Sequence, residues 1–233
     1  MSLQVALMQE ITSRLGLLEK SKLVLDSNQC QIRQIAAKEY FVAWQGSHGL
    51  AQVFDEEQNP LQTYAAIVQN RFYSALLEDG GLLQIAYHVR GDQVVNHRLC
   101  FFPCPITLTE NDFVVGLGDA VVGLSLEEIG ARWNHTCIVR FEFNQATMSE
   151  VHPAAHVTFC KACCRVPMVG PINAGAFINF VLTHFYPEQV SANPGLISHT
   201  TKVLQKTITS PQRNNLHFNL EAPLLATLLT TGA

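Results

Sequence analysis

Charged side chains are scarce in this chain. Asp, Glu, Lys and Arg make up 15% of its 233 residues, and hydrophobic residues make up 48%. Disorder requires low hydrophobicity and high net charge, so this composition excludes a chain that is disordered throughout. Long apolar runs are also missing, since no segment approaches the roughly 18–20 residues that span a bilayer. The start of the chain lacks the basic and apolar stretches of a secretion signal. We therefore expect a globular cytoplasmic protein without a membrane span.

An excess of positive charge is missing as well. Fifteen Lys and Arg against nineteen Asp and Glu give a formal net charge of −4, so nothing global attracts nucleic acid or an anionic membrane. Histidine is more abundant: protonating all nine would move the charge from −4 to +5. Solubility and partner binding are therefore expected to depend on pH just below neutral. The composition does not indicate an oligomeric state.

Common catalytic sequence motifs are absent. The chain has no phosphate-binding loop, no dinucleotide-binding GxGxxG, no HExxH and no GxSxG. The segment 116–119 (GLGD) lacks both the lysine and the spacing of a phosphate-binding loop. We therefore expect no cofactor.

The seven cysteines do not form a recognisable metal motif. Most lie in apolar, strand-like runs, which is typical of buried reduced thiols. Cys160, Cys163 and Cys164 suggest half a zinc site, with Cys137 or His156 as further ligands. The second, well-separated ligand pair of a structural zinc site is missing. We therefore expect no bound metal, and no disulfide under reducing conditions.

His152 and His156 have the HxxxH spacing that brings two imidazoles to one metal on a helix. Val157 and Phe159 predict a strand here instead. At about 3.3 Å per residue in a strand, the two histidines lie roughly 13 Å apart. The pair alone therefore does not indicate a metal site.

Helix and strand signals occur together along the chain. Apolar residues at helical spacing predict helices over 3–18 and 173–185, and Asn59-Pro60 predicts the start of a helix that continues to about Leu77. Several alternating runs predict strands. We expect a single α+β domain over 1–233 with a mostly antiparallel sheet and helices packed on one face. The helix 3–18 and the segment 190–233 are candidates for peripheral parts.

The segments 82–90 and 93–102 predict a β-hairpin around the turn Gly91-Asp92. If Arg90 pairs with Gln93 and the pairing of the two strands continues without a bulge, Ala86 lies opposite His97. Tyr87 then faces the core, and His97 lies on the opposite, polar face.

A second pair of strands is predicted over 137–144 and 155–160. Alternation places Arg140 and Glu142 opposite Phe141, and His156 opposite Val157. If both strand pairs share one core face, six Arg, His and Glu side chains gather on the other: His88, Arg90, His97, Arg140, Glu142 and His156. We expect Arg140, Glu142 and His156 within side-chain contact, with His97 or Arg165 nearby.

This polar face has two interpretations. An antiparallel sheet commonly has one solvated face, and arginine and histidine also make structural hydrogen bonds. Lysine, glutamate and threonine dominate an ordinary solvated face, however, whereas arginine and histidine dominate here. That composition suits binding of a phosphate or carboxylate, with histidine available for proton transfer near neutral pH.

The residues of this region also carry a resemblance. The series formed by 140–144 (RFEFN), 152–157 (HPAAHV) and 164–167 (CRVP), preceded by 97–105 (HRLCFFPCP), is similar to an uncharacterised bacterial family catalogued as domain of unknown function 2290. The resemblance spans roughly residues 35–190. It implies a small bacterial cytoplasmic protein and supplies no activity. The family has an aspartate where this chain has Glu142, which keeps a carboxylate but lengthens its reach. The positions that it marks are His97, Arg140, Glu142, His152, His156 and Arg165.

Three functional hypotheses remain. The first is an interaction or regulatory protein that uses the polar face as a recognition surface or as a buried structural network. The second is an enzyme acting on a phosphodiester or nucleotide, with His156 or His97 as general acid–base, Glu142 orienting a histidine, and Arg140 and Arg165 holding the anion. The third is a domain stabilised by zinc. Residue types without a known substrate do not establish catalysis, so the interaction protein is the first hypothesis.

Overall fold

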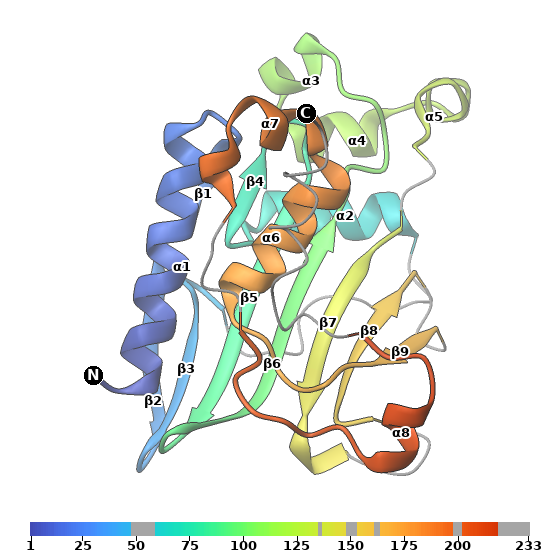
Figure 1. Ribbon diagram of the computed structural model, residues 1–233. Coiled ribbons are helices and arrows are strands. Elements are labelled where there is room, and N and C mark those ends of the chain that lie inside the picture. The colour runs from blue at the N-terminus through green and yellow to red at the C-terminus, as the bar shows by residue number, and fades with distance from the viewer. Residues whose placement is uncertain (48–58, 135–136, 148–152, 161–163, 198–201, 219–233) are drawn as a thin grey trace.

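The computed structural model describes residues 1–47, 59–134, 137–147, 153–160, 164–197 and 202–218. Nine strands of these residues form one antiparallel sheet (Figure 1). Its order is β1-β4-β5-β6-β7-β8-β9, with β3 also paired to β5, and β2 paired to β3. The strands are β1 Val24–Ser27, β2 Cys30–Ala36, β3 Glu39–Trp44, β4 Ala75–Leu77, β5 Leu82–Arg90, β6 Gln93–Phe102, β7 Val139–Asn144, β8 Ala155–Phe159 and β9 Arg165–Pro167.

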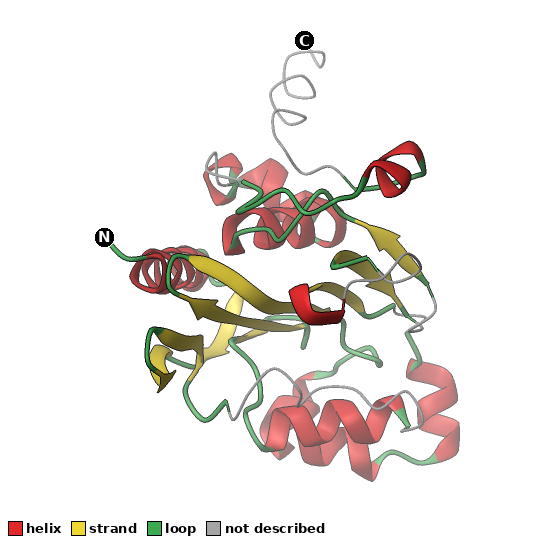
Figure 2. Ribbon diagram, turned by 90° about the horizontal axis from the view of Figure 1, so that it is seen from below, coloured by secondary structure: helices red, strands yellow, loops and turns green. Residues whose placement is uncertain are grey.

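Helices lie on both sides of the sheet (Figure 2). The α+β class and the mostly antiparallel sheet are confirmed. None of the described helices is long and apolar enough to cross a bilayer. The helices are α1 Leu3–Lys20, α2 Pro60–Gln69, α3 Glu110–Val115, α4 Leu117–Gly123, α5 Leu126–Arg132, α6 Ala174–Phe185, α7 Pro187–Ala192 and α8 Ser210–Asn214, with short 3₁₀ helices η1 Gln145–Thr147 and η2 Pro194–Leu196.

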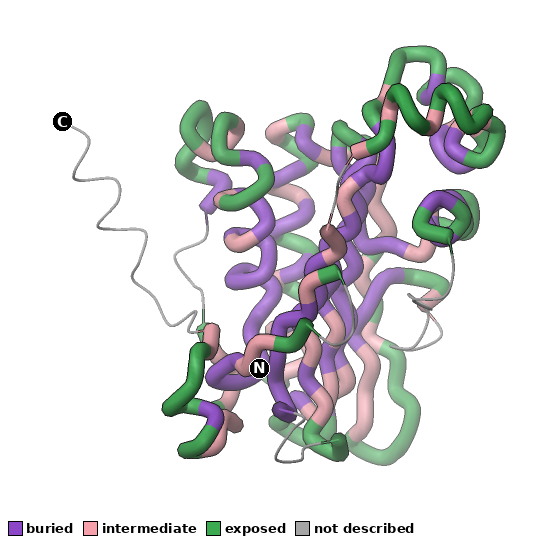
Figure 3. The backbone as a smooth tube through the Cα atoms, turned by 90° about the vertical axis from the view of Figure 1, so that its right-hand side faces the viewer, coloured by how far each residue is buried: buried purple, intermediate pink, exposed green. Residues whose placement is uncertain are grey.

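One face of the sheet packs against α1 and α6. Leu7 and Ile11 of α1 and Phe177 of α6 are buried in the same apolar cluster as Tyr87 of β5 and Phe141 of β7. Figure 3 shows the buried residues concentrated in the central strands and in the helix surfaces that face them. We call this the core face.

The described helices cover the opposite face at one end. There Tyr64 of α2 and Val121 of α4 pack against Leu82 at the start of β5 and Phe102 at the end of β6. The rest of this face carries the polar side chains of β5 to β8, and we call it the polar face. Helices thus cover part of the second face as well as the first.

The helix that begins at Pro60 is shorter than predicted. It ends at Gln69, and Arg71 follows with φ +54°. Ala75–Leu77 then form β4, which pairs with both β1 and β5. The prediction of helix to Leu77 is wrong because apolar residues at helical spacing cannot reveal that a short segment is needed as a strand in the sheet.

The predicted hairpin forms, but its register changes along β6. Gly91 takes φ +62° in the turn, which suits glycine, and Arg90 pairs with Gln93 as predicted. A β-bulge then inserts Val95 as an extra residue, so that Tyr87 pairs with His97. The prediction that Ala86 lies opposite His97 is wrong.

This one-residue shift exchanges the two faces for the rest of β6. His97 lies on the core face and is buried, and Arg98 takes the predicted place of His97 on the polar face. The predicted alternation of β7 and β8 is confirmed, since Phe141 pairs with Val157 on the core face and Glu142 pairs with His156 on the polar face.

Candidate functional site

Two neighbouring rows of side chains cross the polar face from β6 to β8. In one row, Arg98, Glu142 and His156 lie at paired positions. In the next row, Arg140 of β7 pairs with Thr158 of β8. Side chains at paired positions on one face are about 5 Å apart, so the antiparallel ladder itself brings these groups together. We call these five residues the polar cluster.

Glu142 is the centre of the polar cluster. Arg98 donates to its Oε1 from Nε at 3.1 Å and from Nη2 at 2.8 Å. Thr158 donates from Oγ1 to Oε2 at 3.1 Å. Arg140 Nε and His156 Nε2 lie 3.5 and 3.6 Å from the same Oε2 atom. The predicted contact of Arg140, Glu142 and His156 is therefore present.

The cluster is largely shielded from solvent. The exposed fractions of the side chains are 9% for Arg140, 7% for His156 and 19% for Glu142. Burial raises the pKa of Glu142, but the hydrogen bond to His156 and the charges of Arg98 and Arg140 outweigh burial and hold this pKa well below its usual range. Glu142 is therefore a permanent carboxylate at neutral pH.

His156 is oriented by the protein on both sides of its ring. Its Nδ1 lies 3.1 Å from the carbonyl oxygen of Pro153, and its Nε2 faces Glu142. A general acid–base must have a nitrogen directed at the substrate. This geometry suits a residue that positions Glu142 better than one that exchanges protons with a ligand.

His97 belongs to the core and not to the polar face. Its Nδ1 donates to the carbonyl oxygen of Phe141 at 3.2 Å, and its Nε2 accepts from the backbone N–H of Ile172 at 3.4 Å. Burial lowers its pKa to about 3. The expectation that His97 lies beside Arg140 on the polar face is wrong, because the Val95 bulge turns its side chain into the core.

Arg98 is the cluster residue that the sequence interpretation missed. Regular alternation from the hairpin turn assigns it to the core face, and a bulge at Val95 leaves no sequence signal as plain as the Gly91 turn. One signal was available: an arginine facing an apolar core needs a partner, which is itself evidence against the regular register.

The other two predicted site residues are Arg165, which is expected near the cluster as the alternative to His97, and His152. Arg165 of β9 is exposed and pairs with Thr158, so it lies at the edge of the same row as Arg140. His152 lies outside the described residues.

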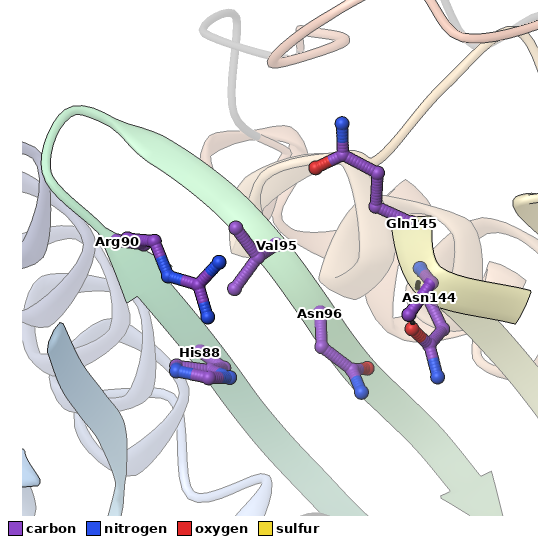
Figure 4. Close-up of a pocket in the computed structure, with 7 residues that line it drawn as sticks. His88, Arg90, Val95, Asn96, Asn144 and Gln145 are labelled. Carbon is purple, nitrogen blue, oxygen red and sulfur yellow. Dashed lines mark hydrogen bonds between the residues drawn. The ribbon is translucent and has the colours of Figure 1, made fainter.

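A pocket of about 460 Å³ opens on the polar face beside the cluster (Figure 4). His88 and Arg90 of β5 line one side, and Asn96 of β6 lies between them and Asn144 at the end of β7. Asn144 is two residues after Glu142 on β7 and lies on the same polar face, where it pairs with Asn96. The full lining is His88, Arg90, Val95, Asn96, Asn144, Gln145 and Ala146.

The bulge and the end of β7 build this pocket. Because Val95 is the extra residue of the bulge, both Val95 and Asn96 contribute to the lining. At Asn144 the strand gives way to η1, and the Asn144 side chain accepts from the backbone N–H of Ala146 at 3.0 Å. On the opposite side of the pocket, Glu39 of β3 positions both basic residues. Its Oε1 lies 2.6 Å from Arg90 Nε, and its Oε2 lies 3.2 Å from His88 Nε2.

The pocket lining is rich in hydrogen-bond donors. It contains one guanidinium, one imidazole and three side-chain amides, and none of its seven described residues is acidic. The amides can donate or accept, and the guanidinium only donates. A negatively charged or strongly accepting group is therefore the ligand chemistry that this lining matches.

Cys137 and Cys160 are joined by a disulfide, with their Cα atoms 4.9 Å apart. The interpretation of these two residues as thiols is wrong, because two residues 23 positions apart meet only when β7 pairs with β8. The absence of a disulfide under reducing conditions stays a prediction. Cys30, Cys100 and Cys104 are free, and burial raises the pKa of each thiol. No three metal-ligating side chains converge within the described ranges.

A family model described as "Uncharacterized conserved protein (DUF2290)" matches residues 23–220. No curated protein and no solved structure matches the chain.

Proposed function

The chain belongs to the family described as uncharacterized conserved protein (DUF2290), and we propose that it is a binding protein for an anionic ligand with a phosphate or carboxylate group. One observation carries the proposal: the pocket on the polar face has Arg90, His88 and three amides in its lining, and none of its described lining residues is a carboxylate. The whole chain has a net charge of −4. A donor-rich pocket without acidic residues is therefore a local departure from the composition of the protein.

The surroundings of the pocket support the same ligand chemistry. Arg98 and Arg140 lie one and two rungs from Asn144, and Arg165 is exposed at the edge of the same face. Among the residues that the structure describes, the carboxylates near these arginines are Glu142 and Glu39. The four arginines outnumber these two carboxylates, and this local excess of positive charge favours an anion.

The exposed side of the Arg90 guanidinium suits direct contact with a ligand. Its side chain is 62% exposed, and Glu39 bonds to its Nε. Figure 4 shows the guanidinium on the pocket side of β5, above His88 and beside Val95. A guanidinium has five donor hydrogens in a planar fork, which matches two oxygens of a phosphate or carboxylate.

The enzyme hypothesis retains one supporting observation. His88 lines the pocket and lies 3.2 Å from Glu39 Oε2, an arrangement in which a carboxylate orients a histidine. Against it, His156 has both ring nitrogens directed at protein oxygens, and His97 is in the core. Binding without catalysis therefore accounts for more of the geometry.

Titration calorimetry with inorganic phosphate and, separately, with citrate tests the proposal. We expect saturable binding of at least one of these anions, weakened by added salt. Arg90→Ala should raise the Kd about tenfold, because a charge-assisted contact contributes on the order of 1.4 kcal/mol. Arg213→Ala is the matched control, since Arg213 is an exposed arginine on α8 that does not line the pocket, and it should leave the Kd unchanged.

Two results would count against the proposal. Absence of binding by both anions at millimolar concentration would remove its basis, and so would equal Kd values for the Arg90→Ala variant and the wild type. Hydrolysis of a phosphodiester such as bis(p-nitrophenyl) phosphate that is lost in the His88→Gln variant would replace it with the enzyme hypothesis.

A further inference from the structure

The Cys137–Cys160 disulfide lies directly beyond the last rung of the β7–β8 ladder. Val139 pairs with Phe159, and the Cys160 N–H donates to the carbonyl oxygen of Ile138 at 2.9 Å. Figure 1 shows β7 and β8 side by side along their length. The disulfide therefore links the start of β7 to the end of β8, and these are the two strands that carry four of the five cluster residues.

This disulfide is open to solvent, unlike the buried Cys100 and Cys104. Cys160 is exposed and Cys137 is half-buried. Cys164 is an exposed free thiol on the adjoining segment, and its carbonyl oxygen accepts from the N–H of Phe159, the residue before Cys160. Cys100 and Cys104, by contrast, are buried free thiols. Exposure concentrates thiol chemistry at this end of the sheet, because exchange requires access to a sulfur.

We propose that Cys137–Cys160 is a thiol–disulfide exchange site whose reactant is a thiol, and that its redox state sets the ligand affinity of the neighbouring polar face. The second half of this proposal rests on the anion-binding function proposed above. The first half stands on the position and exposure of the disulfide alone.

The exchange follows ordinary disulfide chemistry. A thiolate of the reactant attacks Sγ of the exposed Cys160, the bond between Cys160 and Cys137 breaks, and its electron pair leaves as the Cys137 thiolate, which takes up a proton. A second reactant thiolate then attacks the reactant's sulfur in the mixed disulfide. The bond to Cys160 breaks, the oxidised reactant is released, and the Cys160 thiolate remains. Two thiols are thus oxidised to one disulfide while the protein disulfide is reduced to two thiols.

The ladder explains how this reaction affects the polar face. Arg140 and Thr158 form the first polar rung inside the disulfide, and Glu142 and His156 form the next one. Asn144, which lines the pocket, follows on β7. When the bond opens, the start of β7 and the end of β8 gain freedom, and this freedom reaches the pocket at the other end of β7 through the rungs of the polar cluster. Ligand binding must then order side chains that the oxidised form holds in place.

Differential alkylation with mass spectrometry tests the exchange. The folded wild type is equilibrated with a graded series of reduced and oxidised glutathione, and free thiols are then alkylated. We expect Cys137 and Cys160 to become labelled together as the buffer becomes more reducing, while the buried Cys100 and Cys104 stay unlabelled as internal controls. Cys164→Ser should leave the Cys137–Cys160 transition in place.

Three outcomes would overturn the exchange site. The disulfide could resist reduction throughout the series in folded protein. Cys137 could be labelled in all buffers, with Cys160 bonded to Cys164 instead. The reduced protein could contain about one zinc per chain by elemental analysis, lost on oxidation, which would identify the cysteines as metal ligands.

Calorimetry with inorganic phosphate on the oxidised and reduced protein tests the link to the polar face. We expect reduction to weaken binding about three- to tenfold and to lower the melting temperature by roughly 5–10 °C, because the unfolded chain loses a cross-link. Saturating phosphate should shift the glutathione transition toward the disulfide by the same factor, since coupling is reciprocal. Equal phosphate affinities in the two states would overturn the link. Absence of phosphate binding in both states would refute the anion-binding function, and the alkylation result would still decide the exchange site.

Discussion

Replacement of Glu142 by glutamine is expected to lower the free energy of unfolding by about 3 kcal/mol. Glutamine has nearly the same shape, so the packing of the polar face is preserved. The charge that Arg98, Arg140 and His156 surround is removed, however, and Arg140 is only 9% exposed. A shielded cation that loses its counter-ion retains its desolvation cost without the compensating attraction. Urea unfolding of both proteins at neutral pH measures the difference.

A second substitution identifies the cause of this loss. In the Glu142→Gln background, Arg140→Met removes the shielded cation that has lost its Glu142 counter-ion and keeps much of the side-chain volume. If the loss of this counter-ion is responsible, the double variant should be more stable than Glu142→Gln alone. Glu39→Gln is the control on the same sheet, since Glu39 also binds an arginine and a histidine but its partner Arg90 is 62% exposed. Its effect on stability should be small, because solvent screens exposed ion pairs.

A loss of less than about 1 kcal/mol in Glu142→Gln would contradict this interpretation. It would mean that water reaches the cluster and solvates Arg140 when the carboxylate is absent. A large loss that Arg140→Met fails to reduce would instead assign the effect to the hydrogen bonds from Arg98 and Thr158.

The sequence predicts the cluster on β7 and β8 because that part of the sheet follows a local rule. Arg140 and Glu142 alternate with large apolar residues, and His156 does the same on the next strand. Alternation fixes the face of each side chain as long as the strand is regular. The strands β7 and β8 follow one another in the chain and are paired in the sheet, so neighbouring strands in sequence are also neighbours in space. Under these two conditions, the alternation of side chains along a strand is sufficient to predict which of them meet on one face.

The same rule fails on β6 because the strand is not regular. The turn at Gly91 predicts the first pairs correctly, and the Val95 bulge then reverses the faces of His97 and Arg98. A bulge is stabilised by contacts across the sheet and not by a marked residue of its own. The same limit explains the Cys137–Cys160 disulfide, whose two residues become neighbours only through β7–β8 pairing. The pocket could not be predicted either, since it needs both the bulge and the end of β7 at Asn144.

The buried position of His97 predicts a loss of stability in mild acid. Its pKa is lowered by burial to about 3, from an ordinary value of 6.5. Below pH 6.5 the unfolded chain therefore binds a proton at His97 that the folded chain does not bind, and stability falls as the pH decreases toward 3. From pH 7 to pH 5 this one group should reduce the free energy of unfolding by about 2 kcal/mol. Glu142, whose pKa lies below its usual range, adds a loss only below about pH 4.5.

Urea unfolding at pH 7, 6 and 5 measures this loss in the wild type and in His97→Gln. Glutamine cannot titrate, so the variant should be less stable at pH 7, because it alters the bonds to Phe141 and Ile172, but should lose about 2 kcal/mol less between pH 7 and pH 5. His184→Gln is the matched control, since His184 is exposed on α6 and its replacement should leave the wild-type pH dependence intact. The window between pH 6.5 and pH 5 separates His97 from Glu142, because the carboxylate stays ionised there in both the folded and most of the unfolded chain. If His97→Gln and the wild type lose the same stability over this range, the acid sensitivity does not come from His97. That result would mean that the folded protein accommodates a protonated His97 ring, contrary to the neutral core histidine inferred from its burial.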